Sequence, residues 1–197
     1  MKIMSFNCRG LTSPIKKTSL RRLIEIHQPD VVLLQETLGS SEDVVRILEA
    51  MLPGWKFVGL DARGRSGGVA SGWNLKRCWC NFSWGIASGL GLEVWEAQVG
   101  RMITILNIYG PYLNRVGFWD SLLSMDLFSG QDVILGGGIL ISLWDLRNSG
   151  DLGLFQMVWK TILYKPLLVR IFWILSLLSW PLLGEISERG FIGWQRD

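Results

Sequence analysis

The sequence predicts a mixed α/β sandwich, a fold in which helices cover β-sheets, and three observations support this. The run "DVVLLQE" at 30–36 is predominantly apolar, which is typical of a fully buried strand. The opening "MKIMSFNCRG" alternates apolar and polar residues and ends in a turn, as a half-buried strand does. The order strand, helix, strand, helix and then several strands is that of an α/β sandwich.

Two helices are expected between and after these strands. The first covers residues 14–28, with Ser13 as its cap and Pro14 in its first turn, and Pro29 ends it. The second covers 41–51, where Ser40 or Ser41 is the cap and acidic residues occupy the first turn. Further strands are expected at 55–62, 67–74, 93–99, 102–111 and 132–137, and a helix at 115–127.

Composition narrows the class of protein only slightly. The 197 residues allow one domain with a sizeable core. A net charge of +3 and a pI near 8.9 are compatible with nucleic-acid contact but do not require it. Cys8, Cys78 and Cys80 fit no disulfide framework, and a single His leaves no zinc pattern. Reduced thiols, and residues 1–20 without a signal peptide's apolar core, predict an intracellular protein of the nucleus or cytoplasm.

Candidate chemistry lies at the ends of the predicted strands. Glu36 ends the buried strand, where α/β sheets place their ligands, and Asn7 ends the strand expected beside it. Together they offer oxygen ligands to Mg²⁺. The simpler interpretation is a turn Asn and a Glu that caps the following loop. Tyr109 ends another strand and could position a phosphate, although a strand Tyr is more often half-buried for packing alone.

Two groups of cations could contact DNA phosphates. Arg63 and Arg65 lie in a loop that runs into a strand, and the helix at 14–28 carries a basic face. The competing interpretation is an ordinary solvated face, since the cations barely outnumber the anions. His27 is expected to be a helix-end cation or a half-exposed spacer.

Five motifs occur in an order that resembles the endonuclease/exonuclease/phosphatase superfamily. They are "IMSFNCRGL" (3–11), "PDVVLLQET" (29–37), "RSGGVASGW" (65–73), "NIYGPY" (107–112) and "DVILGG" (132–137). The "FNCRGL" and "SGGVASGW" segments narrow the resemblance to the apurinic-like endonuclease domain at the start of LINE-type (non-LTR) retrotransposon polyproteins. The resemblance covers residues 1–138.

This resemblance implies a four-layer α/β sandwich of the DNase I type and Mg²⁺-dependent cleavage of DNA. Asn7 would match the family's first active-site Asn, Glu36 its metal-binding Glu, and Tyr109 its Tyr near the scissile phosphate. The family continues with a "GGDFN"-like motif and ends with a catalytic Asp and His. Here neither an acid nor an Asn follows Gly137 directly, and no His follows His27. The sequence therefore predicts an endonuclease remnant without catalytic activity.

A frameshift at the glycine run would explain this break. When the codons after Gly138 are re-read one base out of frame, residues 139–197 can encode a stop-free string that begins "DFDF". Near its end that string carries "PTWRN" and "VAKR", which resemble the later part of the same retrotransposon domain. We therefore expect a partial endonuclease domain over 1–138 and an out-of-frame hydrophobic tail over 139–197.

Two other interpretations remain open. Residues 166–183 carry one charge and approach the length of a membrane span, although Arg170 would cost about 2.5–3.5 kcal/mol on insertion. Alternatively, the basic loop serves a non-catalytic DNA-binding module.

In all cases we expect residues 1–138 to form half of the sandwich, with the first sheet exposing a face meant for a partner layer. The sequence does not indicate the oligomeric state.

Overall fold

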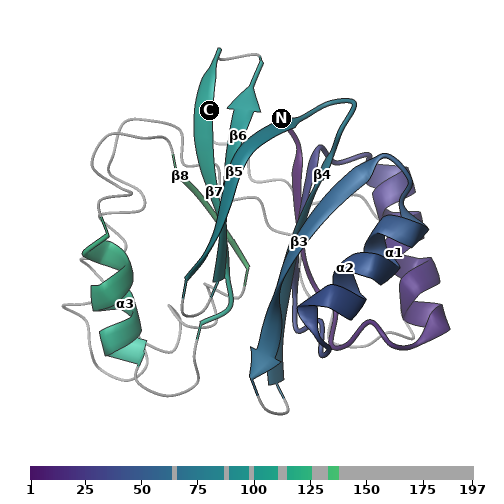
Figure 1. Ribbon diagram of the computed structural model, residues 1–197, viewed down its shortest axis with the longest axis horizontal. Helices are drawn as coiled ribbons and strands as arrows, with labels where there is room; N and C mark the ends of the chain where they lie inside the picture. Colours follow the sequence, from purple (N-terminus) through teal and green to yellow (C-terminus); the bar gives the residue numbers. More distant parts are fainter. Residues whose placement is uncertain (64–65, 87–88, 98–99, 111–114, 126–132, 138–197) are drawn as a thin grey trace, which may run out of the picture.

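Two β-sheets pack face to face, with helices on their outer faces (Figure 1). This computed structural model describes residues 1–63, 66–86, 89–97, 100–110, 115–125 and 133–137. Within them the layers follow the order helices, sheet, sheet, helix. The predicted four-layer α/β sandwich is therefore confirmed.

The first sheet has the strand order β1-β2-β4-β3. Its strands are β1 (Ile3–Asn7), β2 (Val31–Gln35), β3 (Trp55–Arg63) and β4 (Ser66–Asn74). Strands β1 and β2 are parallel, with α1 (Pro14–His27) as their crossover, and the other pairs are antiparallel. The helix α2 (Ser41–Met51) connects β2 to β3. Parallel neighbours end at the same edge of a sheet, so β1 and β2 deliver their last residues side by side.

The second sheet has the order β5-β6-β7-β8. Its strands are β5 (Trp79–Ile86), β6 (Gly89–Glu96), β7 (Arg101–Ile108) and β8 (Val133–Gly137). Strands β7 and β8 are parallel, and α3 (Arg115–Leu123) lies between them in the sequence. Sequence patterns missed β5, because its burial does not alternate and a bulge between Cys80 and Phe82 shifts its register.

Helix caps agree with the sequence in one case and differ in the other. Ser40 caps α2, since its hydroxyl accepts a hydrogen bond from the backbone N–H of Asp43 at 3.2 Å. Ser13 occupies the N-cap position of α1, but its side chain makes no capping bond. Pro14 at the first turn instead helps to set the backbone there, as its fixed φ suits a helix start.

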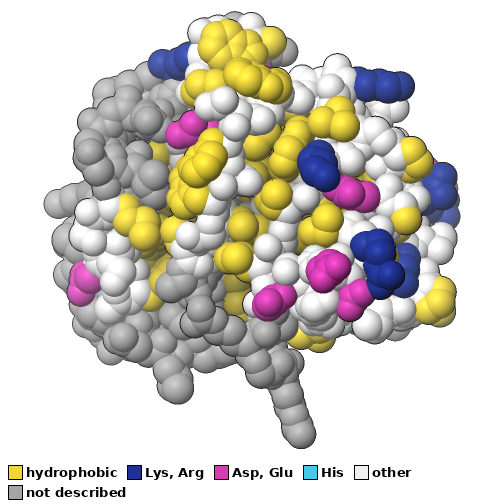
Figure 2. Space-filling model, viewed as in Figure 1, with side chains coloured by type: hydrophobic (Ala, Val, Ile, Leu, Met, Phe, Trp, Pro, Cys, Tyr) yellow, Lys and Arg dark blue, Asp and Glu magenta, His cyan; other side chains and the backbone are white. Residues whose placement is uncertain are grey.

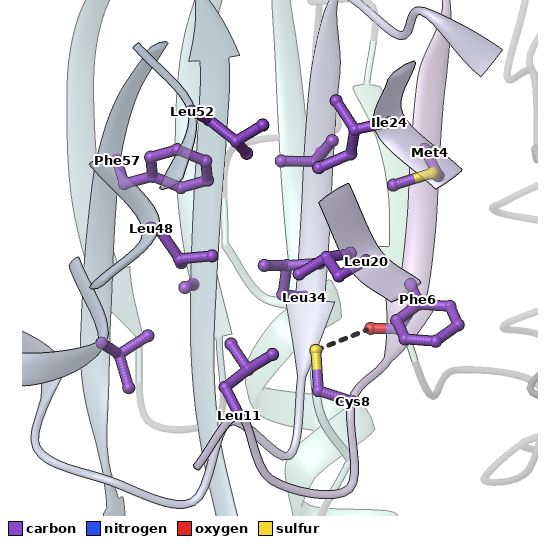
Figure 3. Packing of buried hydrophobic residues seen from close by; sticks show 13 residues of the cluster. Met4, Phe6, Cys8, Leu11, Leu20, Ile24, Leu34, Leu48, Leu52 and Phe57 are labelled. Carbon is purple, nitrogen blue, oxygen red and sulfur yellow. Dashed lines mark hydrogen bonds between the residues drawn. The ribbon is translucent and has the colours of Figure 1, made fainter. Parts of the chain in front are cut away.

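Each face of the first sheet has its own apolar core. Between α1, α2 and the first sheet, Leu20, Leu34 and Leu48 are fully buried (Figure 3). Between the two sheets, side chains on the other faces of the strands form a second cluster, with Leu33, Leu92 and Ile105 fully buried at its centre. The first sheet is therefore covered on both faces.

The expectation of an exposed first sheet is thus wrong, because residues 1–137 already supply strands for both sheets. Exposed apolar surface lies instead on β5 and β6, where Trp79, Phe82 and Trp95 are 61%, 59% and 41% exposed. Figure 2 shows hydrophobic side chains over the sheets and interspersed cations and anions over the half that carries α1 and α2. No helix within the described ranges is long and apolar enough to cross a membrane, and residues 166–183 lie outside them.

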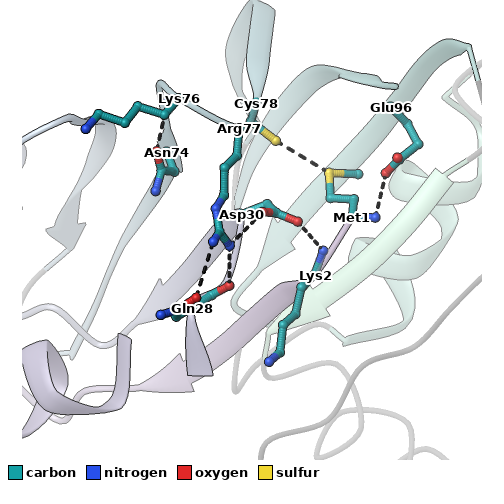
Figure 4. Close-up of polar contacts among 9 residues, drawn as sticks. All are labelled: Met1, Lys2, Gln28, Asp30, Asn74, Lys76, Arg77, Cys78 and Glu96. Carbon is teal, nitrogen blue, oxygen red and sulfur yellow. Dashed lines mark hydrogen bonds and ion pairs between the residues drawn. The ribbon is translucent and has the colours of Figure 1, made fainter. Parts of the chain in front are cut away.

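The starting end of β1 and β2 is held by Asp30 (Figure 4). Its Oδ2 accepts a hydrogen bond from the backbone N–H of Lys2 at 2.7 Å, and Arg77 Nη1 lies 3.5 Å from its Oδ1. Arg77 also donates to the backbone oxygen of Gln28 at 3.0 Å. These contacts fix the two parallel strands at one end, and the opposite end carries the candidate site.

Candidate active site

Strand alternation carries two of the predicted residues into the space between the sheets. On β1, Ile3 packs in the core between the sheets, so the side chains of Ser5 and Asn7 point the same way. On β7, Ile103 and Ile105 pack in that core, which directs Asn107 and then Tyr109 towards the first sheet. Asn7 and Tyr109 therefore converge from opposite sheets on one end of the sandwich.

Glu36 reaches the same place by breaking the alternation. Leu33 and Gln35 face the second sheet, so a regular strand would send Glu36 towards the helices instead. Its φ of +52° is left-handed, an uncommon conformation for a residue with a side chain. Arg9 and Leu38 in the two adjoining loops also have positive φ. Such strain concentrates at functional sites, and here it is what turns the carboxylate towards Asn7 and Tyr109.

One carboxylate oxygen receives two hydrogen bonds from different sheets. Asn7 Nδ2 donates to Glu36 Oε1 at 2.8 Å, and the Tyr109 hydroxyl donates to the same oxygen at 3.1 Å. All three side chains are half-buried. The Oδ1 atom of Asn7 accepts from the backbone N–H of Arg9 at 3.1 Å, which fixes the amide orientation. The structure thus brings together the three site residues that the sequence predicted from separate motifs.

Backbone bonds support this triad from both sides. The N–H groups of Cys8 and Gly10 donate to the oxygens of Gln35 (2.8 Å) and Glu36 (2.6 Å), so β1 and β2 stay paired beyond their ends. On the other side, the N–H of Thr37 donates to the oxygen of Gly68 at 3.2 Å. Glu36 is therefore held between two loops, and its unusual backbone is determined by its neighbours rather than by its own preference.

The neighbouring thiol is structural. Cys8 is fully buried, its Sγ lies 3.8 Å from the oxygen of Phe6, and burial raises the pKa of its thiol far above the usual range (Figure 3). Lys16 partly opposes this effect, and its ammonium donates to the backbone oxygens of Cys8 and Arg9. A protonated buried thiol is not a nucleophile. All three cysteines are free in the structure.

The donor set suits a cation that is shared with a substrate. Within the described residues, no hydrogen bond or ion pair reaches Glu36 Oε2. No group of three or more His, Cys, Asp or Glu side chains gathers in these residues as a metal cage. Mg²⁺ is commonly held by one or two carboxylates, waters and substrate phosphates, so a single carboxylate with a free oxygen fits that mode.

Two glycines at the end of β8 allow this strand to lie close to its neighbours. A Cβ atom on Gly136 would lie 2.3 Å from Leu33 Cδ1, in the core between the sheets. Gly137 has φ +109°, and a Cβ there would lie 2.0 Å from the backbone oxygen of Ile108. Because Ile108 precedes Tyr109, these glycines let β8 approach the strand that carries the site.

The remaining predicted residues are only partly placed. Arg63 ends β3, opposite Ser66, and its side chain lies outside the described set, as does the whole of Arg65. The start of β4 lies beside the loop of Glu36, because the backbone oxygens of Gly67 and Gly68 accept hydrogen bonds from the N–H groups of Leu38 and Thr37. His27 ends α1 half-buried, and burial and Lys2 lower the pKa of its imidazole.

Sequence reasoning missed Gln35 and Asn107, which lie just beneath the triad. Gln35 Nε2 donates to Asn107 Oδ1 at 2.7 Å, and both side chains are buried. Each is a polar residue on an inward-facing position of an apolar strand, and this was the signal available in the sequence.

The fold and the triad together define a class, the α/β sandwiches with an acidic site at one end of two paired sheets. A profile of the Endonuclease/Exonuclease/phosphatase family matches residues 4–138, so the chain belongs to this family. Its members generally depend on divalent metal ions. No match was found among curated proteins.

Solved structures share the fold at low identity. They include the 3′ phosphatase NExo from Neisseria bound to a product DNA hairpin (TM-score 0.55, 19% identity, 70% of this chain and 56% of that one). A mannosyl-6-phosphatase from Bacteroides thetaiotaomicron matches with TM-score 0.53 and 13% identity, over 70% of this chain and 64% of that one. The APE2 catalytic domain from Xenopus laevis gives 0.53 and 16%, over 70% and 57%. This chain therefore spans 56–64% of the length of these structures.

Proposed function

We propose that residues 1–138 are the first part of a LINE-type (non-LTR) retrotransposon endonuclease, which retains its metal-binding half-site and has lost DNA cleavage. The observation that carries this proposal is the pair of hydrogen bonds from Asn7 and Tyr109, on opposite sheets, to one oxygen of Glu36. The motif order supports the LINE-type origin, in particular "FNCRGL" at 6–11 and "SGGVASGW" at 66–73.

Each residue of the triad has a distinct role in this proposal. Asn7 and Tyr109 hold Oε1 of Glu36, which leaves Oε2 to bind a divalent cation, with Mg²⁺ as the proposed ion. The cation, when bound, supplies Lewis-acid polarisation of a phosphoryl oxygen. Tyr109 would orient the phosphate through its hydroxyl, whose single proton would then be donated to a phosphate oxygen instead of Glu36 Oε1. Arg63 and Arg65 contact DNA phosphates.

The proposed loss of cleavage follows from what replaces the second half of the motif set. Catalysis of phosphodiester hydrolysis requires several groups aimed at the charge that develops in the transition state. Gly138 and Leu140 stand where the "GGDFN"-like motif of the resembling family has its Asp and Asn, and no His follows His27. The family match also ends at residue 138, which supports a break at this point. We propose that a frameshift in the glycine run caused it.

Plasmid nicking tests the catalytic part of the proposal. Full-length protein with Mg²⁺ is expected to leave supercoiled plasmid as intact as buffer alone does. Glu36→Ala protein, purified in parallel, is the control for a contaminating nuclease. Nicking by the wild type that disappears in Glu36→Ala would show that the chain is an active endonuclease.

DNA sequence tests the proposed origin. The codons for Gly136 to Ile139 are expected to lie in a G-rich tract where a single-base change restores an acid directly after the glycines. The restored frame is expected to continue without a stop to the end of the present one. A tract in which no single-base repair yields a "GGDF"-type motif would contradict the frameshift, and would leave the metal-site proposal standing.

A further inference from the structure

A layer of polar side chains crosses the apolar core directly beneath the triad. It consists of Ser5 on β1, Gln35 on β2, Ser71 on β4 and Asn107 on β7, and none of these is more than 8% exposed. Apolar side chains such as Leu33 and Ile105 surround this layer. Polar groups buried at this depth are costly unless every one is paired, so the pairing of this layer constrains the structure strongly.

Asn107 is the member that joins the two sheets. Its Nδ2, which carries two hydrogens, lies within hydrogen-bonding distance of the backbone oxygens of Leu34 (3.2 Å) and Ala70 (3.0 Å) and of Ser71 Oγ (3.1 Å). Its Oδ1 accepts from Gln35 Nε2 at 2.7 Å. A side chain from the second sheet is therefore anchored to two neighbouring strands of the first.

Gln35 extends this anchor along the first sheet. Besides Asn107, its Nε2 lies within hydrogen-bonding distance of Ser5 Oγ (3.2 Å) and the backbone oxygen of Leu33 (3.0 Å). Apolar contacts between sheets tolerate small slides, because dispersion and burial are not directional. Hydrogen bonds are directional, so the amide pair fixes one offset between β2 and β7.

This offset determines the geometry of the triad. Gln35 immediately precedes Glu36, and Asn107 lies on β7 two residues before Tyr109, which directly follows that strand. The distance of 3.1 Å between the Tyr109 hydroxyl and Glu36 Oε1 spans the two sheets, and it changes with any slide between them. The amide pair is a directional contact between β2 and β7, the strands that lead into the two groups.

We propose that Gln35 and Asn107 are positioning residues, which lock the two sheets in the one offset that lets Tyr109 and Glu36 form a cation site. This inference rests on the proposed function, because it concerns the affinity of the same site. It goes beyond stability: the two amides set the affinity of Glu36 for the cation through the geometry that they impose.

The test replaces both amides together, in the variant Gln35→Leu/Asn107→Leu. Replacing both amides by apolar groups of similar size leaves neither member of the pair unsatisfied by the other, although Ser5 and Ser71 each lose one hydrogen bond, so the unfolding free energy of the variant is measured alongside. Mn²⁺ binding, measured by the electron paramagnetic resonance of the free ion, is expected to weaken about 10- to 100-fold, as for other outer groups that orient a metal ligand. Thr104→Val is the control, since it removes a buried polar group from the other face of β7.

A second readout needs no metal. In protein labelled with fluorotyrosine, Tyr109→Phe assigns the Tyr109 resonance among the three tyrosines. Glu36→Gln is expected to shift this resonance in the wild type, because the two side chains are bonded, and to leave it unchanged in the double-leucine background. Should the double-leucine variant fail to fold, the exchange Gln35→Asn/Asn107→Gln is measured instead, and it is expected to retain the coupling between Tyr109 and Glu36.

The outcomes separate the two proposals. Wild-type protein that binds no Mn²⁺ would overturn the proposed function, and the fluorine coupling would still test the positioning role. Unchanged Mn²⁺ affinity together with unchanged fluorine coupling in the double-leucine variant would overturn the positioning role and reduce the amides to a structural contact. A loss of Mn²⁺ affinity in Thr104→Val as large as that in the double-leucine variant would also overturn the positioning role.

Discussion

Gly137 gives the sharpest prediction about how β8 supports the site. In Gly137→Ala the new Cβ would meet the backbone oxygen of Ile108 at 2.0 Å, with the backbone carbon and nitrogen of Ile108 at 2.9 and 3.0 Å. These are backbone atoms of a paired strand, so they cannot rotate away as a flexible side chain would. Relief requires β7 and β8 to separate next to Tyr109.

The expected cost has two parts. A residue with a side chain held at φ +109° costs about 1–3 kcal/mol. Forcing an extra carbon into a packed site costs a further 1–3 kcal/mol or so. The sum of about 2–6 kcal/mol is a large fraction of the roughly 5–15 kcal/mol that stabilises an ordinary domain. Gly54→Ala isolates the first part, because Gly54 has φ +85° and no atom lies within 4 Å of its added Cβ.

Urea unfolding followed by tryptophan fluorescence measures both variants against the wild type. Gly137→Ala is expected to lower the free energy of unfolding by more than Gly54→Ala, by the packing cost of about 1–3 kcal/mol. Equal losses in the two variants would refute the close approach of β8 to Ile108, and with it the register that places Gly137 beside the site.

Three further predictions concern the core, the single histidine and the DNA contact. Leu34→Ala is expected to lower the free energy of unfolding by about 2–5 kcal/mol, because Leu34 is fully buried. The control Leu75→Ala changes a side chain that is 58% exposed, and its free energy of unfolding is expected to stay within about 0.5 kcal/mol of the wild type. Equal losses in the two variants would contradict the packing of α1 and α2 on β2. Burial and Lys2 lower the pKa of the His27 imidazole in the folded protein, so the unfolded chain takes up the proton first as the pH falls. Stability that is present above pH 6.5 is therefore lost as the pH falls towards the folded pKa, and unfolding measurements over a pH series should show a smaller loss in His27→Gln than in the wild type. Identical pH profiles of the two proteins would contradict this. In gel-shift titrations over a salt series, Arg63→Gln/Arg65→Gln is expected to reduce the slope of the log DNA-binding constant against log salt by about 1 per phosphate contact. The control Arg46→Gln changes an exposed arginine and is expected to leave the slope unchanged. A double variant with the wild-type slope would show that these arginines do not contact DNA.

The elements of this fold differ in how far the sequence predicts them. The helix at 41–51 was predicted with its observed bounds, because a serine cap, acids in the first turn and an apolar face all agree. The strand β5 was missed, since its bulge and mixed exposure remove the period of two. Burial of the first sheet on both faces could not be predicted either, because it depends on how much of the second sheet these residues supply.

The residues of the candidate site also differ in how far the sequence predicts their positions. Asn7 and Tyr109 could be placed by counting along strands of period two. The direction of Glu36 could not, because it depends on a left-handed backbone that the neighbouring loops impose. Gln35 and Asn107 lie 72 residues apart and meet only when the two sheets pack face to face, so their pairing is a property of the tertiary structure.

The central claim is that Glu36, held by Asn7 and Tyr109, is a cation ligand at the end of the sandwich. The most direct test is a Mn²⁺ titration of the full chain, with the free ion followed by electron paramagnetic resonance. We predict saturable binding that is lost in Glu36→Gln and kept in Glu42→Gln, which removes an exposed acid from the first turn of α2. Binding that is the same in Glu36→Gln as in the wild type would contradict the claim.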